Sequence, residues 1–210
     1  MKESVEMEIL LSVILGYLLG SLNPAALIGK FKQTNLKKSG TGNLGATNVL
    51  LHFGKGYAVL VMLFDIFKAV AAFHLAALLF PAVEMASYLG GAAAVVGHIF
   101  PFYLKFKGGK GLAAFGGFVL AVDPHVFLFL LVTGVVAMLL VNYSVALPYY
   151  GGIAFPVIMW VLKKAVPVIA VCTAVSGLIL YKHAGNVKKA MDGTDNKIRE
   201  YVATKLFAKK

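Results

Sequence analysis

The 210-residue sequence is 60% hydrophobic and only 14% charged, which excludes an ordinary soluble domain and indicates an integral membrane protein. The formal net charge of +11 could indicate nucleic-acid binding, but the basic residues cluster between apolar runs, a pattern typical of membrane topology. We therefore expect no nucleic-acid partner. The single cysteine, Cys172, excludes an internal disulfide, and no His, Cys, Asp and Glu have metal-ligand spacing. We expect no metal or other cofactor.

Seven apolar runs are candidate transmembrane helices, because roughly 20 apolar residues in a helix cross the hydrocarbon core. The fourth is only about 17 Å long at 1.5 Å per residue, and Asp123-Pro124 separates it from the fifth. The sequence predicts an all-α seven-helix bundle, with 1–210 as one domain. The predicted spans are 9–29, 57–80, 85–104, 112–122, 125–141, 143–162 and 165–181.

The distribution of basic residues predicts the orientation of these spans. With the N-terminus outside, sixteen basic residues fall on the cytoplasmic side, and only Lys2, Lys163 and Lys164 fall on the other. Residues 183–210 then form a basic cytoplasmic tail. This topology places three polar segments, 37–48, 105–111 and 181–195, at the cytoplasmic face, where a compact bundle can bring them together.

The first polar segment reads KKSGTGNLGATN, from Lys37 to Asn48. Its glycines allow successive backbone N–H groups to turn toward one point and form an anion-binding nest. Its hydroxyl and amide side chains can add neutral hydrogen bonds. The alternative is a flexible connection capped by Thr47 or Asn48. The candidate phosphate-binding residues are Gly40, Thr41, Gly42, Asn43, Gly45, Thr47 and Asn48.

The second polar segment reads FKGGKG, from Phe106 to Gly111, and precedes a predicted helix. Backbone amides, a helix N-terminus and a lysine together favour a phosphate site. The spacing is not that of a P-loop, which needs four residues between its glycines. The alternative is a turn that only marks topology. The candidate site residues are Lys107, Gly108, Gly109, Lys110 and Gly111.

The third polar segment, YKHAGNVKKAMDGTD, contains His183 and Asn186, whose spacing puts both on one face of a helix. His183 could act as a base, a proton donor or a phosphate ligand, or be an interfacial histidine that ends a helix. Within the predicted spans, Asp65 and Lys68 have the same spacing and could neutralise one another. His98 could position the lysine-glycine turn or simply pack.

The motif set resembles the bacterial acyl-phosphate:glycerol-3-phosphate acyltransferase family of the PlsY type. The similar segments are GSLNPAALIGK (20–30), GTGNLGATN (40–48), FDIFK (64–68), GHIFPFYLKFKGGKG (97–111) and HAGNVKKAMDGTD (183–195). They extend over nearly the whole chain.

The resemblance implies a reaction that moves a fatty acyl group from acyl phosphate to glycerol 3-phosphate, giving lysophosphatidic acid and phosphate. Acyl phosphate is already activated, so direct attack needs no acyl-enzyme, and the sequence has no Gly-x-Ser-x-Gly elbow. The implied partners are the two substrates and the lipid bilayer. The implied location is the bacterial inner membrane, with the active site facing the cytoplasm. The implied catalytic residues are Thr41, Lys110, His183 and Asn186.

The chain departs from the family pattern at three positions. Thr41 replaces a serine and keeps the hydroxyl, and Asp195 replaces a glutamate. Leu51 stands where an arginine is common, which removes a bidentate phosphate ligand. His52 and Lys55 could supply replacement charge.

Two other functions are open at this stage. One is a divergent relative that uses another acceptor or has lost catalysis. The other is a small transporter of a phosphorylated solute. Transporters favour internal repeats and polar sites near the bilayer midplane, whereas this chain shows no repeat and collects its polar motifs at one face. The pattern favours the enzyme.

Overall fold

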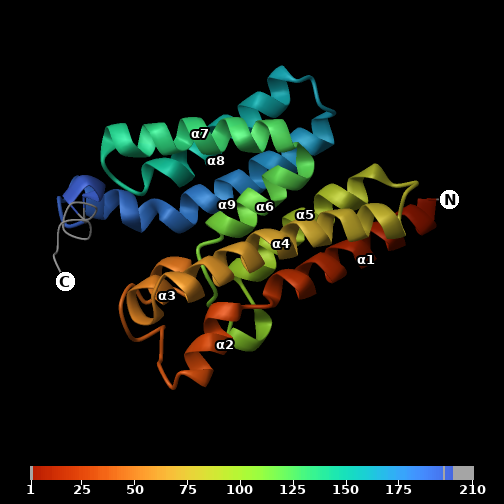
Figure 1. Cartoon of the computed structure of the whole chain (residues 1–210). Coiled ribbons are helices and arrows are strands. Elements are labelled where there is room, and N and C mark those ends of the chain that lie inside the picture. Colours follow the sequence, from red (N-terminus) through yellow and green to blue (C-terminus); the bar gives the residue numbers. More distant parts are fainter. Residues whose placement is uncertain (1, 196, 201–210) are drawn as a thin grey trace.

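The structure is a computed structural model that describes residues 2–195 and 197–200, and it contains only helices and irregular segments over those residues. Figure 1 shows two groups of long helices, one with α1, α4 and α5 and one with α7, α8 and α9, with α6 between them. The elements are α1 Lys2–Ser21, α2 Pro24–Phe31, α3 Ala46–Phe53, α4 Lys55–Leu79, α5 Glu84–Ile99, the 3-10 helix η1 Phe102–Leu104, α6 Leu112–Val122, α7 Pro124–Val141, α8 Ala146–Val161 and α9 Val166–Met191.

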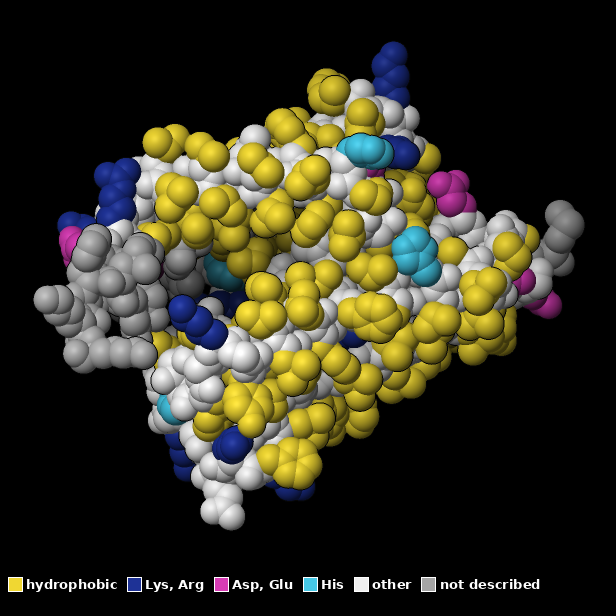
Figure 2. Space-filling model, in the orientation of Figure 1, with side chains coloured by type: hydrophobic (Ala, Val, Ile, Leu, Met, Phe, Trp, Pro, Cys, Tyr) yellow, Lys and Arg dark blue, Asp and Glu magenta, His cyan; other side chains and the backbone are white. Residues whose placement is uncertain are grey.

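Five of the described helical segments are long and apolar enough to cross a membrane, and α6 and α8 are shorter apolar helices. The five are Lys2–Phe31, Lys55–Leu79, Glu84–Leu104, Pro124–Val141 and Val166–Met191. The all-helical prediction is therefore confirmed over the described residues. Figure 2 shows apolar side chains over the flank of the molecule, with lysine and arginine gathered at the end where α2 and α3 lie.

The first predicted span is divided, because α1 ends at Ser21 and α2 begins at Pro24. Asn23 caps α2: its side-chain oxygen accepts a hydrogen bond of 2.8 Å from the N–H of Ala26. Proline at the first position of α2 favours the same break, because it has no N–H to donate. The span predicted over 9–29 lies within the candidate span Lys2–Phe31, but it consists of two helices instead of one. Hydropathy did not predict the break, because the residues on both sides of Asn23 are apolar.

The structure also adds helix where the sequence predicted polar segments. Helix α3 begins at Ala46, inside the expected loop 37–48, and Gly54, at φ +84°, separates it from α4. Helix α9 continues to Met191, ten residues beyond the predicted end of its span at 181. Residues 183–191 of the predicted tail therefore belong to α9, whereas residue 196 and residues 201–210 lie outside the described residues.

Glycines bring α1 and α5 into very close contact. A Cβ atom on Gly16 would lie 2.0 Å from the carbonyl oxygen of Gly90, and one on Gly20 would lie 2.0 Å from that of Ala94. Gly97 on α5 is equally close to the backbone of α1, at 2.3 Å from the carbonyl oxygen of Tyr17. Small residues four positions apart allow this approach, which favours helix association in lipid. The packed pair of α1 and α5 supports the polar segments at the end of the bundle where α2 lies.

Candidate active site

The three polar segments meet at one end of the bundle. Lys37 Nζ donates a hydrogen bond of 3.1 Å to the carbonyl oxygen of Leu104, which joins the first segment to the residue immediately before the second. Lys110 Nζ donates to Asn186 Oδ1, which joins the second segment to α9. Figure 2 shows the surface hollowed between α9 and the part that contains α3, with lysine and histidine side chains reaching into the hollow.

Asn48 organises the first segment. Its side chain is fully buried, and its Nδ2 group donates to the carbonyl oxygens of Leu36 and Ser39 at 2.7 and 3.2 Å. Its Oδ1 atom accepts a hydrogen bond of 2.9 Å from the N–H of Thr41. Both Nδ2 donors are therefore used within the protein, and Asn48 holds the loop in shape rather than offering a donor to phosphate.

Gly40 is required by the close packing of this loop. Its φ of +58° lies in the left-handed region, and a Cβ atom there would lie 2.2 Å from Asn48 Oδ1 and 2.5 Å from His52 Cε1. Within α3, the Nδ1 atom of His52 lies 2.9 Å from the carbonyl oxygen of Asn48, one helical turn earlier. His52 therefore braces the loop, whereas the neighbouring side chain of Leu51 is exposed.

The remaining polar groups of the first segment are open to solvent. Thr41 and Thr47 are exposed, and Asn43 is partly exposed beside Gly45. The N–H of Asn43 donates a long hydrogen bond of 3.4 Å to Thr41 Oγ1. Gly42, at φ +70°, donates its N–H to the carbonyl oxygen of Ser39 at 3.1 Å. Among the described residues, no hydrogen bond joins these polar side chains directly to Lys110, His183 or Asn186.

The glycines of the second segment permit close packing against α5. The N–H groups of Gly108 and Gly109 donate to the carbonyl oxygens of Ile99 and His98 at 3.0 and 3.1 Å. A Cβ atom on Gly109 would lie 2.1 Å from His98 Nε2 and 2.9 Å from the carbonyl oxygen of Leu44. These two amides therefore fix the loop and are not available to a phosphate, although the sequence had offered Gly108 and Gly109 as phosphate-binding residues.

Two other amides of the second segment are available. Among the described residues, the N–H groups of Lys110 and Gly111 have no hydrogen-bond acceptor. Gly111, at φ +88°, precedes α6 and fits between the side chains of Ile99 and Ile179. The pair thus lies at the N-terminus of an 11-residue helix, where the helix dipole favours negative charge. Lys107 is exposed and belongs to the lysine group around Lys37.

Lys110, His183 and Asn186 form the polar centre. His183 and Asn186 share a face of α9, and the hydrogen bond from Lys110 brings the ammonium group to the same place. Burial, reinforced by the charge of Lys189, lowers the pKa of Lys110 below the ordinary lysine value. His183 is 5% exposed, and its Nδ1 atom lies 2.9 Å from the carbonyl oxygen of Ile179. That hydrogen bond leaves Nε2 as the proton acceptor of the neutral ring.

A buried ionic cluster underlies the second segment. Asp65 Oδ1 lies 2.7 Å from Lys68 Nζ and 3.2 Å from His98 Nδ1, and Lys68 also donates to the carbonyl oxygen of Leu22 at 2.8 Å. The three side chains are each at most 3% exposed. The predicted pairing of Asp65 with Lys68 is therefore confirmed. Because His98 also contacts Gly109, the cluster connects the α1–α2 break, α4 and α5 to the loop that carries Lys110.

Sequence reasoning missed two residues that support this end of the bundle. Asn23 Nδ2 donates a long hydrogen bond of 3.4 Å to the carbonyl oxygen of Leu44. Tyr103 accepts a hydrogen bond of 3.1 Å from the N–H of Asn23 and donates one of 2.9 Å to the carbonyl oxygen of Ser21. The Asn-Pro pair at 23–24 is the signal that could have predicted the first, because asparagine before proline is a common helix cap.

The comparisons with known proteins cover almost the whole chain. A family model described as glycerol-3-phosphate acyltransferase matches residues 10–193. Glycerol-3-phosphate acyltransferase 1 of Deinococcus radiodurans is 36% identical over 194 residues, which are 92% of this chain and 98% of that protein. A glycerol-3-phosphate acyltransferase of Thermus thermophilus is 35% identical over 91% of this chain and 96% of that protein.

The fold also matches a solved integral membrane enzyme. The crystal structure of PlsY (YgiH), a glycerol 3-phosphate acyltransferase, in its glycerol 3-phosphate form gives a TM-score of 0.84 at 33% identity, over 90% of this chain and 94% of that one. Its lysophosphatidic acid form gives a TM-score of 0.81 over the same shares. The chain thus belongs to the glycerol-3-phosphate acyltransferase family of integral membrane enzymes.

Proposed function

We propose that the acyl donor is a fatty acyl phosphate and that transfer to glycerol 3-phosphate is direct. The acceptor hydroxyl oxygen attacks the carbonyl carbon of the donor, and the bond from that carbon to the phosphate oxygen breaks. The leaving phosphate keeps the electron pair, and the products are lysophosphatidic acid and inorganic phosphate. The acceptor proton goes to His183 Nε2 or to a phosphate oxygen of a substrate. The contact of Lys110 with Asn186, beside His183, is the observation that carries this proposal.

Each polar group at the centre has a task in such a transfer. The ammonium group of Lys110 and the free N–H groups of Lys110 and Gly111 supply donors for the donor phosphate or for the developing oxyanion. Asn186 orients Lys110 through its Oδ1 atom and keeps its Nδ2 group for a substrate oxygen. A catalyst of this kind works mainly by orienting two bound substrates, so it needs no covalent intermediate.

The first segment is proposed to hold the second phosphate. Thr41, Asn43 and Thr47 offer hydroxyl and amide donors at its accessible surface, and the N-terminus of α3 begins at Ala46. Gly40, Gly42, Gly45 and Asn48 shape the segment. The carbonyl oxygen of Leu44 contacts Gly109, which supports a position for this segment next to the Lys110 loop.

The proposed topology has seven crossings, an outside N-terminus and a cytoplasmic C-terminus in the inner membrane of a bacterium. The sixteen-to-three distribution of basic residues supports it. The residues of the basic segment 183–210 then face the cytoplasm, as does the polar centre. An active site at this boundary gives glycerol 3-phosphate access from water while the acyl chain remains among apolar helices.

Intact-protein mass spectrometry tests whether transfer is direct. The purified chain is mixed with palmitoyl phosphate without acceptor, and its mass is followed over time. Direct transfer predicts no acyl adduct and no phosphate release beyond slow hydrolysis. Addition of glycerol 3-phosphate then yields lysophosphatidic acid and phosphate in equal amounts. A protein adduct with the mass of one acyl group that disappears when acceptor is added would contradict direct attack. Use of acyl-coenzyme A at the same rate as palmitoyl phosphate would contradict the proposal that acyl phosphate is the donor.

A further inference from the structure

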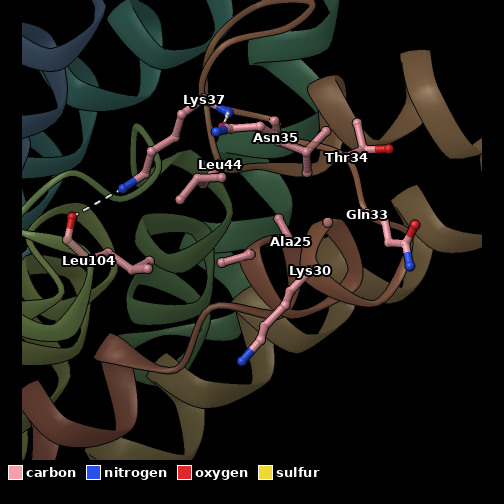
Figure 3. A pocket seen from close by; sticks show the side chains of 11 residues that line it. Ala25, Lys30, Gln33, Thr34, Asn35, Lys37, Leu44 and Leu104 are labelled. Atoms are coloured by element: carbon pink, nitrogen blue, oxygen red, sulfur yellow. Dashed lines mark hydrogen bonds between the residues drawn. The ribbon is translucent and has the colours of Figure 1, made fainter.

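A pocket with two lysines in its wall lies between α2 and the segment that follows it. Its volume is about 410 Å³, and Figure 3 shows Lys30 and Lys37 on opposite sides of a floor that contains Ala25 and Leu44. Gly29, Asn35 and Leu104 are also in its wall. Lys110, His183 and Asn186 do not line it, so this pocket is separate from the polar centre described above.

The pocket carries positive charge that the protein does not neutralise. Lys37 reaches the carbonyl oxygen of Leu104, and its pKa is lowered by partial burial and by the charges of Lys107 and Lys105. The Lys30 side chain makes no hydrogen bond or ion pair with any described residue. No acidic side chain is among the residues that line the pocket. An anion bound in the pocket beside Lys37 would offset the repulsion that Lys37 experiences from Lys107 and Lys105.

The outer surface of α2 is apolar next to this pocket. Ala26 and Lys30, one helical turn apart, line the pocket, and Leu27 and Phe31 form the adjacent row on the same helix. Leu27 is exposed, and Phe31 is 85% exposed at the end of the candidate span Lys2–Phe31. Exposed leucine and phenylalanine next to lysine on one helix are typical of a helix at the boundary between hydrocarbon and headgroups.

We propose that this pocket binds the phosphate headgroup of an anionic bilayer lipid, with Lys30 and Lys37 as its charged ligands. The phosphate is bound by the two ammonium groups, and Asn35 and Gln33, which also line the pocket, offer amide groups to the rest of the headgroup. The acyl chains run along Leu27 and Phe31 on the outer face of α2. The site is a lipid-binding site beside the active site and takes no part in the chemical step.

Native mass spectrometry of the full chain in a non-ionic detergent tests this site, with phosphatidylglycerol as the probe and phosphatidylcholine as the neutral comparison. We expect the wild-type protein to retain phosphatidylglycerol preferentially. Lys30→Gln and Lys37→Gln should each weaken that binding about fivefold, the effect of one lysine at an anionic membrane surface. Lys38→Gln is the matched control: it removes the same charge from the same segment but does not line the pocket, and it should change binding less than about twofold.

Three results would overturn the proposal. An equal loss for Lys38→Gln and Lys30→Gln would indicate diffuse attraction without a site. Equal retention of phosphatidylcholine would remove the requirement for an anion. Inorganic phosphate that binds as tightly as phosphatidylglycerol would identify a free anion as the ligand instead of a lipid. Because Lys37 also donates to Leu104, its variant is interpreted only if its unfolding temperature matches that of the wild type. If it does not match, Lys30→Gln decides, because it removes no hydrogen bond or ion pair between described residues.

Discussion

Lys110 places its ammonium group in a half-buried position beside Asn186, whereas Lys105, five residues earlier, is exposed. We expect Lys110→Ala to lower kcat/KM by roughly 10–150-fold, the loss of one hydrogen bond to a charged group, and Lys105→Ala to have little effect. Steady-state phosphate release, measured with both variants at several glycerol 3-phosphate concentrations, checks this expectation. Equal, small effects of the two substitutions would indicate that the 105–111 segment is a turn that only marks topology.

The lowered pKa of Lys110 predicts a pH dependence of activity. The ammonium form is present below its pKa, so activity that needs the charge falls as pH rises through that pKa. Burial and Lys189 move this fall below the ordinary lysine range, around 10.4. Lys110→Arg keeps the charge and should move the falling limb of kcat/KM to higher pH. Identical alkaline limbs for the two proteins would show that another group controls the profile.

Among the elements, α4 and α5 are joined to the α1–α2 break by the ionic cluster of Asp65, Lys68 and His98. Asp65→Leu leaves Lys68 without its carboxylate partner and should reduce the free energy of unfolding by about 3–5 kcal/mol. The double variant Asp65→Leu/Lys68→Met removes both charges and should recover much of that loss. Unfolding temperatures in detergent give the order wild type, double variant, single variant. A single variant as stable as the wild type would contradict the structural role of the cluster.

Most helices could be predicted because hydropathy and helix breakers coincide with their ends. Asp123 and Pro124 fixed the boundary of α6 and α7, and the Asp123 side chain does cap α7. The break at Asn23 was missed because one polar residue barely changes the mean hydropathy of its window. The extension of α9 to Met191 was missed because its last two turns are polar and extend beyond an apolar run.

The candidate site could be predicted in part. The spacing of His183 and Asn186 correctly places both on one helix face, and Lys110 meets Asn186 there. The roles of Gly108, Gly109 and Asn48 could not be predicted, because a glycine that admits a neighbouring backbone and a glycine that presents its N–H look alike in sequence. Only the tertiary contacts show that the N–H groups of Gly108 and Gly109 donate to α5.

For the molecule as a whole, the topology proposal puts the first and second polar segments on the same side of the membrane. Single cysteines at Lys38 and Lys105, in a Cys172→Ala background, should react with an impermeant maleimide only from the cytoplasmic side. Lys163→Cys, after α8, should react only from the other side. Labelling of positions 38 and 105 from opposite sides of the membrane would rule out a shared site.

The decisive measurement for direct acyl transfer is phosphate release from palmitoyl phosphate by the purified protein, with and without glycerol 3-phosphate, beside the Lys110→Ala variant. Direct transfer predicts that phosphate appears only with the acceptor, in a one-to-one ratio with lysophosphatidic acid, and that Lys110→Ala slows both products equally. Phosphate release that is independent of glycerol 3-phosphate, or lysophosphatidic acid formation that Lys110→Ala leaves unchanged, would contradict it.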